Sequence, residues 1–348
     1  MTVSSASQTT LNRIINGNMT IDQRNAGVVT ANTITGYTLD RWSVAQSVVG
    51  KFTVQQNAAA VTPPDGFINY LGVTSASAYS VLAGDYYFLQ QSIEGLNMGD
   101  LMWGSASAKT VTLSFKVYSS LTGTFGGALS NSARNRSYPF TYSIPVANTW
   151  TTISVTIAGD TTGTWLTTNG VGVYVQFGLG VGTTYSGTAG TWAASAYNSA
   201  TGATSVVGTS GATFYITGVQ LEAGGAASNF ENLQYGQQLA LCQRYYEKSY
   251  NQSTVPATGE IAGAASSISS STAPTQGNGV TFKVTKRAAP TMAIYNGVTG
   301  AVGYSYRVSD ASSVATTFSH IGEHGVAYIN IPSSANGYYF HFTAASEL

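Results

Sequence analysis

The stretch VTLSFKVY at positions 111–118 determines how the rest of the chain is interpreted, because apolar and polar side chains alternate along it without a break. Val111, Leu113, Phe115 and Val117 share one parity, which places them on one face of an extended strand. The pattern predicts an antiparallel strand with one buried face. The same alternation returns at 153–157, 171–179, 280–284 and 338–342.

Turn signals separate these segments. Five Asn-Gly dipeptides occur in the chain, and such pairs suit tight hairpins or loops between strands. Many short strands joined by turns are typical of β-sandwiches. Within 214–222 the apolar parity changes at Gly218, which predicts a β-bulge at this glycine. We therefore expect an all-β protein.

One segment has helical rather than strand periodicity. Tyr235, Leu239, Cys242 and Tyr246 recur at i, i+4, i+7 and i+11, which predicts a helix over about 233–248 with one apolar stripe. This stripe can pack on its own sandwich or on copies of itself around a threefold axis, and we interpret it as the oligomerisation helix. Beyond it, a stretch rich in Ser, Ala, Thr and Gly indicates a domain boundary near residue 250.

The composition limits the partners of this protein. Its 348 residues include 14 basic and 14 acidic side chains, and only 8% are charged, whereas about a quarter is usual. A net charge of zero without a Lys/Arg run gives no field that attracts nucleic acid or anionic lipid. No apolar run of about 18 residues and no signal sequence is present, so we expect synthesis in the cytoplasm without membrane insertion. A single cysteine excludes a disulfide-stapled scaffold.

A long uncharged segment contains the candidate binding residues. Residues 161–221 include no acidic, basic or His side chain, and 180–212 has the composition of a long loop that carries aromatic residues. Aromatic rings can cover the C–H faces of sugars while amide and hydroxyl groups meet their hydroxyls. The candidates for carbohydrate binding are Tyr185, Trp192 and Tyr197, followed by Trp165 and Trp103. Alternatively, Trp103, Trp150 and Trp165 fill the sandwich or a subunit interface.

Titratable residues do not form a convincing catalytic or metal pattern. His320, Glu323 and His324 match H-x-x-E-H, but Gly322 and Gly325 argue against the helix that this zinc motif requires. We expect no metal and no cofactor. Glycan hydrolysis needs two carboxylates about 5 to 10 Å apart. The scattered acidic residues considered for it are Asp65, Asp85, Glu94, Asp100 and Asp160. We expect no catalytic residue among them.

Four short motifs carry a family resemblance. NRIINGN at 12–18 leads to YTLDRW at 37–42, and TGVQLEAG at 217–224 leads to LCQRYYE at 241–247. Together they resemble tail-fibre and other virion surface proteins of tailed bacteriophages. The resemblance implies a jelly roll similar to carbohydrate-binding modules over about residues 10–250. The C-terminal FHFTAASEL at 340–348 also resembles the small β-rich tip that often follows in this family.

The resemblance implies a domain organisation and an assembly. We expect an N-terminal attachment segment at 1–11, a jelly-roll domain at 12–232, a connecting helix at 233–250 and a smaller C-terminal β-sandwich at 251–348. It also implies a homotrimer that docks onto other virion proteins, tail or capsid, through the N-terminal segment.

Within the family motifs, three roles follow from position. Trp42 is expected in the core, with Asp40 and Arg41 as an ion pair at a strand end. Glu222 is expected to anchor the closing strand to the N-terminal segment.

The expected function is adhesion rather than catalysis: a phage tail fibre on the virion surface that binds a host surface polysaccharide. Two alternatives stay open from sequence. The chain is a capsid decoration or architectural virion protein without a ligand, or it is a glycan depolymerase.

Overall fold

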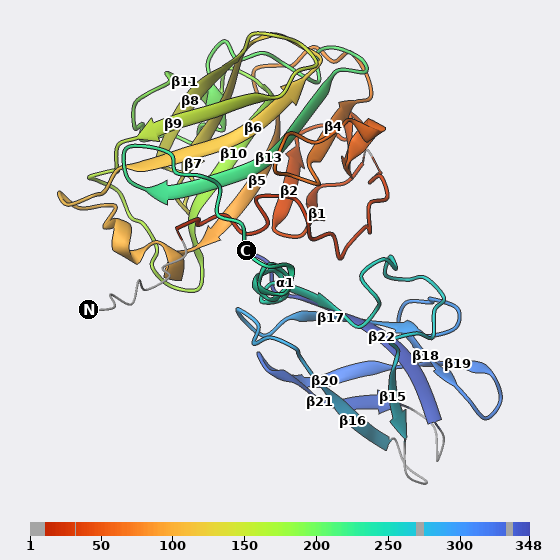
Figure 1. Cartoon of the computed structure of the whole chain (residues 1–348). Coiled ribbons are helices and arrows are strands. Elements are labelled where there is room, and N and C mark those ends of the chain that lie inside the picture. The colour runs from red at the N-terminus through yellow and green to blue at the C-terminus, as the bar shows by residue number, and fades with distance from the viewer. Residues whose placement is uncertain (1–10, 32, 269–274, 332–336) are drawn as a thin grey trace, which may run out of the picture. The chain divides into compact units, whose positions relative to one another are not determined.

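The computed structural model describes residues 11–31, 33–268, 275–331 and 337–348, and its chain divides into two compact units (Figure 1). Unit 1 comprises Met1–Thr20, Ala31–Gly36 and Ser43–Leu233. Unit 2 comprises Ile21–Thr30, Tyr37–Trp42 and Gln234–Leu348. Two short N-terminal segments thus belong to the C-terminal unit, although the sequence placed them in the jelly roll. The expected attachment segment lies outside the described residues except for Leu11.

Unit 1 is built from two antiparallel sheets. One sheet has the order β2-β5-β10-β7-β8 and the other β3-β4-β13-β6-β9. The strands of the first sheet are β2 (Trp42–Gln46), β5 (Tyr86–Glu94), β7 (Gly123–Ser130), β8 (Ser137–Ile144) and β10 (Val171–Val181). Those of the second are β3 (Phe52–Gln56), β4 (Leu71–Ser75), β6 (Val111–Ser119), β9 (Thr151–Ile157) and β13 (Thr213–Ala223). The chain changes sheet between β5 and β6, β6 and β7, β8 and β9, β9 and β10, and β10 and β13, which is a jelly roll.

Minor elements complete unit 1. They are the 3₁₀ turns η1 (Ala58–Ala60), η2 (Gly95–Asn97) and η3 (Gly99–Leu101), and the two-residue strands β11 (Ser186–Gly187) and β12 (Ser199–Ala200). Strand β1 (Gly36–Leu39) begins in a segment of unit 1 and continues in one of unit 2.

The inner faces of the two sheets form one core. Phe115 of β6 lies 5.1 Å from Phe177 of β10, and Phe125 of β7 lies 6.1 Å from Phe214 of β13, measured between ring centroids. All four rings are buried. The predicted alternation in 111–118 and 171–179 is confirmed, because the apolar set of each strand faces this core.

The predicted bulge in β13 is present. The pairing of β13 with β6 shifts register between Thr217 and Gln220, and Gly218 has a φ of 61°. A Cβ at Gly218 would lie 2.7 Å from the ring of Phe67, so glycine is required for both backbone and packing reasons. The bulge leaves Val219 free to pair with the N-terminal segment, where its N–H donates to the carbonyl of Gly17.

Glu222 has a different partner from the one expected. Its carboxylate accepts hydrogen bonds from the backbone N–H and hydroxyl of Ser228. The N-terminal segment is held instead by Asn12, whose Oδ1 accepts from the backbone N–H of Leu221 and whose Nδ2 donates to the carbonyl of Val219. A short amide fits this position because it can satisfy a backbone donor and a backbone acceptor together.

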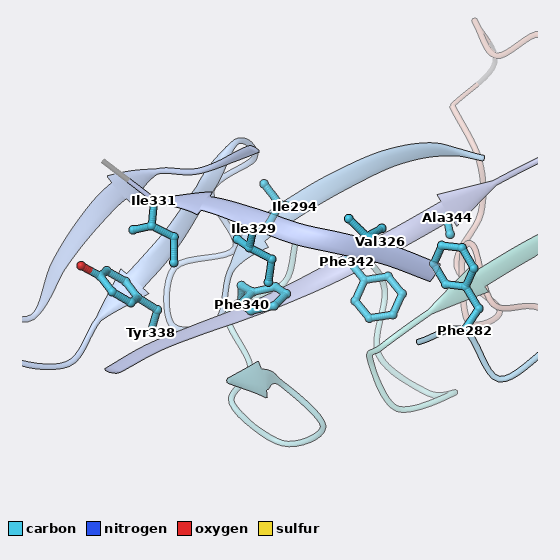
Figure 2. Packing of buried hydrophobic residues seen from close by; sticks show 9 residues of the cluster. All are labelled: Phe282, Ile294, Val326, Ile329, Ile331, Tyr338, Phe340, Phe342 and Ala344. Atoms are coloured by element: carbon cyan, nitrogen blue, oxygen red, sulfur yellow. The ribbon is translucent and has the colours of Figure 1, made fainter. Parts of the chain in front are cut away.

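Unit 2 is a smaller β-sandwich. In one sheet, β22 (Gly337–Ala345) pairs with β14 (Tyr246–Lys248), β15 (Ala265–Ile268), β17 (Thr291–Asn296) and β18 (Tyr304–Arg307), and β18 pairs with β19 (Ser312–Ala315). The other sheet has the order β16-β21-β20, with bounds Thr275–Thr281, Gly325–Ile331 and Thr317–Ile321. Figure 2 shows Phe340 and Phe342 of β22 packed against Val326 and Ile329 of β21.

The helix of unit 2 is shorter than predicted. Helix α1 spans Tyr235–Gln243, and the chain then turns into strand β14 (Tyr246–Lys248). Tyr246 therefore lies on a strand and cannot extend the helical stripe. The helical periodicity predicts the structure correctly for about two turns. Beyond them, the pairing of β14 with β22 overrides this local pattern.

The N-terminal segments of unit 2 join a buried network of charges. Arg41, which was expected to pair with Asp40, forms an ion pair with Glu347. Its guanidinium lies 3.6 Å from the ring centroid of Tyr245. Asp40 accepts two hydrogen bonds of 2.6 Å from Gln23, one from its backbone N–H and one from its side-chain Nε2. Trp42 is fully buried, as predicted.

Candidate functional site

The outer face of the β5-β10 pair carries an unusual set of side chains. Period-2 alternation sends Val175 and Phe177 into the core, so Tyr174 and Gln176 point to the opposite face. Gln176 is paired in register with Gln90 of β5, and Gly178 with Phe88. Amide and aromatic side chains of two neighbouring strands, β5 and β10, therefore share this face. Figure 1 shows the course of these two strands.

Part of the long loop predicted at 180–212 crosses this face. Its strands β11 and β12 pair in parallel, and Ser199 of β12 lies directly over Gly126 and Gly178. A Cβ at Gly126 would lie 2.5 Å from the Ser199 Oγ, and a Cβ at Gly178 would lie 2.7 Å from it. Glycine at these two positions lets the loop approach the sheet closely. The loop is thus packed on the sheet and positions its own side chains there.

A cavity of about 300 Å³ lies between the loop and the sheet. It is lined by Ala45, Tyr86, Phe88, Arg134, Tyr185, Ala196 and Asn198. The ring of Tyr86 lies 5.5 Å from that of Tyr185, edge to face, and 5.8 Å from that of Phe88. This volume is at the lower end of the range of small-molecule sites. We call this cavity and its lining residues the β5-loop cleft.

Two buried glutamines support Asn198, the one amide side chain that lines the β5-loop cleft. The Nε2 of Gln176 donates to the Oε1 of Gln90 and to the Oδ1 of Asn198, each at 3.1 Å. All three side chains are buried. The Oε1 of Gln176 is buried and accepts no hydrogen bond from any residue in the described part of the chain. Buried amides that are fixed in this way present oriented donors and acceptors.

One cation borders the β5-loop cleft. The Nη2 of Arg134 donates to the Oε1 of Gln90 at 2.7 Å, and its guanidinium lies 4.0 Å from the ring centroid of Tyr174. Burial lowers the pKa of Arg134 from its ordinary value, because the charged form loses contact with water. The group nevertheless stays protonated, since a guanidinium does not lose its proton in proteins.

The structure separates the sequence candidates into three places. Tyr185 lines the β5-loop cleft. Trp103, Trp165 and Trp192 instead form a triad with ring centroids 4.7 to 5.4 Å apart, and Trp192 also lies 5.2 Å from Tyr138.

The indole N–H groups of this triad all donate to protein acceptors. They reach the carbonyl of Lys109, the carbonyl of Thr162 and the carbonyl of Ala158, respectively. Trp103 is buried, whereas Trp165 and Trp192 are half-buried. Such satisfied and mutually packed indoles stabilise the loops that carry them. Trp150 is also engaged, because its N–H donates to the carbonyl of Thr62.

Tyr197 packs within the loop and is not among the residues that line the β5-loop cleft. Its ring contacts Gly187, where a Cβ would lie 2.2 Å from the ring carbon Cδ2. Its backbone N–H donates to the hydroxyl of Ser137. This tyrosine therefore helps to hold the segment between β11 and β12 in place.

Sequence reasoning missed most residues of the β5-loop cleft. The lining residues Tyr86, Phe88, Arg134 and Asn198 were not singled out, nor were Gln90 and Gln176, which support Asn198 and Arg134. A signal for Gln176 was present in the alternation of 171–179, because Tyr174 and Gln176 occupy the polar parity of a strand whose other parity is apolar. The strand pairing that brings Gln90 and Gln176 together is not visible in the sequence.

Three of the carboxylates considered for catalysis, Asp85, Asp100 and Asp160, have structural partners. Asp160 accepts two hydrogen bonds from Arg136, at 2.8 and 2.5 Å, and these lower the pKa of its carboxyl against the opposing effect of burial. Asp85 accepts from Ser47, Tyr79 and the backbone of Leu82. No carboxylate lines the β5-loop cleft among the residues that the structure describes.

The described part of the chain contains no group of three or more His, Cys, Asp or Glu side chains arranged to hold a metal ion. His320 lies within strand β20, and His324 contacts the hydroxyl of Thr285. Only the turn between β20 and β21 separates them, so the H-x-x-E-H motif is not helical here.

The oligomerisation residues divide between surface and core. Tyr235 is 51% exposed, and Leu239 is half-buried. Cys242 and Tyr246 are buried within unit 2. A contact with other chains can therefore involve Tyr235 and Leu239, together with the exposed Leu241, but not the last two members of the predicted stripe.

Unit 2 has a cavity of its own, of about 480 Å³. It is lined by Glu247, Ser249, Tyr250, Asn251, Gln252, Gly263, Ala265, Thr281, Lys283 and Phe342. Beside it, Glu247 forms a buried ion pair of 2.6 Å with Lys286. Because the Lys286 ammonium also donates to the carbonyls of Gln243 and Val284, it is fully used by the protein.

Comparisons with known proteins give only distant similarities. No protein-family model and no curated protein matches the sequence. Among solved structures, the enzymatically active domain of tailspike protein 4 of bacteriophage CBA120 gives a TM-score of 0.34 at 12% identity, over 61% of this chain and 21% of that one. This chain therefore matches about a fifth of that tailspike structure.

Two carbohydrate-binding modules are similar to the same extent. TmCBM61 in complex with β-1,4-galactotriose gives a TM-score of 0.31 at 10% identity, over 61% of this chain and 99% of that one. A family 11 module from Clostridium thermocellum in complex with a mixed-linked tetrasaccharide gives 0.29 at 12% identity, over 58% and 96%. Similarity at this level carries no argument about function, so the function is inferred from the residues of this chain. No helix among the described residues has the length and apolar character to cross a bilayer.

Proposed function

We propose that this protein is a carbohydrate-binding component of a bacteriophage virion, a tail fibre that adheres to host surface glycans through the β5-loop cleft. The observation that carries the proposal is the combination of aromatic rings and one fixed amide, that of Asn198, in a small cavity whose lining includes no carboxylate. Rings such as Tyr86 and Tyr185 can cover the C–H face of a sugar, and Asn198 can bind its hydroxyls. The placement on a virion comes from the resemblance of the motifs at 12–18, 37–42, 217–224 and 241–247.

Catalysis is not part of the proposal. A glycosidase needs a pair of carboxylates on either side of the scissile bond. The lining of the β5-loop cleft offers none, and Asp160 and Asp85 are engaged elsewhere. The protein would thus retain its glycan rather than cleave it.

The assembly is proposed to be a homotrimer. Two apolar side chains on α1, Tyr235 and Leu241, are exposed, and Tyr235 is 51% exposed. They support a contact between chains, because removing this apolar surface from water would stabilise the assembly. The N-terminal segment is proposed to dock onto other virion proteins, but residues 1–10 lie outside the described part of the chain.

Binding to a glycan panel tests the proposal. We expect the full chain to bind at least one surface polysaccharide or oligosaccharide, and we expect Tyr86→Ala and Asn198→Ala to lower the affinity by about tenfold or more, since each removes a direct contact. Thr152→Ala is the matched control, because Thr152 lies on β9 of the other sheet. Correctly folded protein that binds no glycan and no host cell would favour the architectural alternative, in which the aromatic residues only pack the virion protein.

A further inference from the structure

The β5-loop cleft contains a cation without a carboxylate partner, and this sets it apart from the other arginines of unit 1. Arg13 pairs with Asp100 at 2.6 Å, and Arg136 pairs with Asp160 at 2.5 Å. Arg134 forms no ion pair with any of the residues that the structure describes. Loss of water acts on its charge, and its electrostatic neighbours are the tyrosine side chains of Tyr174 and Tyr86.

A half-buried cation without a counter-charge is costly, so its position calls for a reason. The chain has only 14 basic residues, and most of its surface is uncharged. The partners of Arg134 are an amide oxygen of Gln90 and the face of Tyr174, and neither neutralises it. The guanidinium therefore retains its capacity to bind an anion.

The local backbone fixes Arg134 in place. Its φ is 53°, in the left-handed region that a side-chain-bearing residue adopts at a cost. Two groups of Asn131 hold this turn: its carbonyl accepts from the N–H of Arg134, and its Oδ1 accepts from the N–H groups of Asn135 and Arg136. Because the turn and the stack on Tyr174 order the side chain beforehand, a ligand does not have to order it on binding.

On these grounds we propose that the β5-loop cleft selects acidic sugars, with Arg134 binding the anionic substituent. This inference rests on the proposed carbohydrate-binding function. The shared chemistry is a planar or compact oxyanion, a carboxylate or a sulfate, which a guanidinium fork binds through two N–H groups. Tyr86 and Tyr185 would then cover the ring, and Asn198 would bind a hydroxyl.

Saturation-transfer NMR with matched monosaccharides tests the inference. The cavity of about 300 Å³ suits single sugar rings, so linkage does not decide the outcome. The probes are glucuronate against glucose, galacturonate against galactose, and galactose 6-sulfate against galactose. For the full chain we expect an affinity about tenfold higher for an acidic member than for its neutral counterpart. The uronates and the sulfate distinguish the two sources of negative charge.

Variants show whether Arg134 is responsible. Arg134→Gln should abolish the ratio of acidic to neutral affinity, while Arg134→Lys should retain part of this preference because it keeps the charge but loses the fork. Lys116→Gln removes one positive charge from β6 in the other sheet and should change nothing. Added salt should weaken acidic binding in the parent chain only.

The outcomes separate the inference from the proposed function. Equal affinity for acidic and neutral sugars, or an acidic preference that survives Arg134→Gln, overturns the inference and leaves the carbohydrate site intact. If neither class binds, while circular dichroism shows folded protein, the carbohydrate-binding function is itself wrong.

Discussion

Gln90 and Gln176 face each other across β5 and β10, and their side-chain amides form a hydrogen bond of 3.1 Å on the outer face of the jelly roll. The same Nε2 of Gln176 reaches Asn198 in the loop above. The register between β5 and β10 therefore positions the side chain of Asn198, although Asn198 itself lies outside any helix or strand. Without this link the amide of Asn198 would be set by the loop alone.

Replacing Gln176 with Leu tests this link. Leu has a similar volume but no donor, so Asn198 loses its fixed orientation while the apolar contacts are kept. We expect a loss of glycan affinity of about tenfold with a destabilisation of only about 1–2 kcal/mol. Calorimetric titration and urea unfolding measure the two quantities. Unchanged affinity in this variant would show that Asn198 does not need Gln176.

Gly178 is predicted to be essential for the placement of the loop. Because its ideal Cβ would lie 2.7 Å from the Oγ and 3.0 Å from the Cβ of Ser199, Gly178→Ala must displace the Ser199 side chain of β12. We expect a destabilisation of about 1–3 kcal/mol and weaker glycan binding together. Gly190→Ala is a useful contrast, since no atom lies within 4 Å of a Cβ there, although its φ of 85° adds backbone strain. A Gly178→Ala variant with parent stability would contradict the close approach.

The tryptophan triad is predicted to be structural. Trp192→Ala removes ring contacts with Trp103, Trp165 and Tyr138, so we expect a loss of about 2 kcal/mol in the free energy of unfolding. Glycan affinity should change little, in contrast to Tyr185→Ala, which removes a wall of the cleft. The reverse result, with binding lost in Trp192→Ala and kept in Tyr185→Ala, would assign the sugar site to the triad.

Unit 2 is predicted to lose stability between about pH 4 and pH 7. Burial raises the pKa of Asp40 from 3.8 to about 7, against the charge of Arg24 and hydrogen bonds from Gln23. The unfolded chain releases this proton near pH 4, so the stabilising contribution is full at lower pH and is lost as pH rises through 7.

Asp40→Asn removes this titration. Between pH 4.5 and pH 7.5, the unfolding free energy of the parent chain should fall by at least about 1 kcal/mol relative to that of the variant. Calorimetry of both chains across this range measures the shift. A constant difference would mean that Asp40 does not titrate in this window.

The trimer is predicted to depend on the exposed side of α1. Tyr235→Ser combined with Leu241→Ser removes apolar surface that the single chain leaves in water, so trimers should dissociate while the fold is kept. Light scattering after size exclusion gives the mass, and circular dichroism serves as the control for folding. If the parent is already a monomer, the trimer proposal is wrong, and the mass of the variant has no bearing on it.

Sequence alone determined the elements whose structure follows from one local periodicity and is not changed by a tertiary contact. The alternation in 111–118 predicted β6 and its buried face, and the parity change at Gly218 predicted the bulge in β13, because both depend on local geometry. The helix was predicted too long, since its C-terminal end from Tyr246 onward forms a strand instead: β14 pairs with β22, almost a hundred residues away along the chain.

Only the tertiary structure decided the composition of the candidate site. Tyr185 was accessible to sequence reasoning because it belongs to an uncharged loop. Gln90, Arg134 and Gln176 come from three separate segments that β-sheet register and a left-handed turn bring together. Register between strands depends on the packing of whole sheets and not on any local pattern, so a cleft built between a sheet and a loop is decided by the fold.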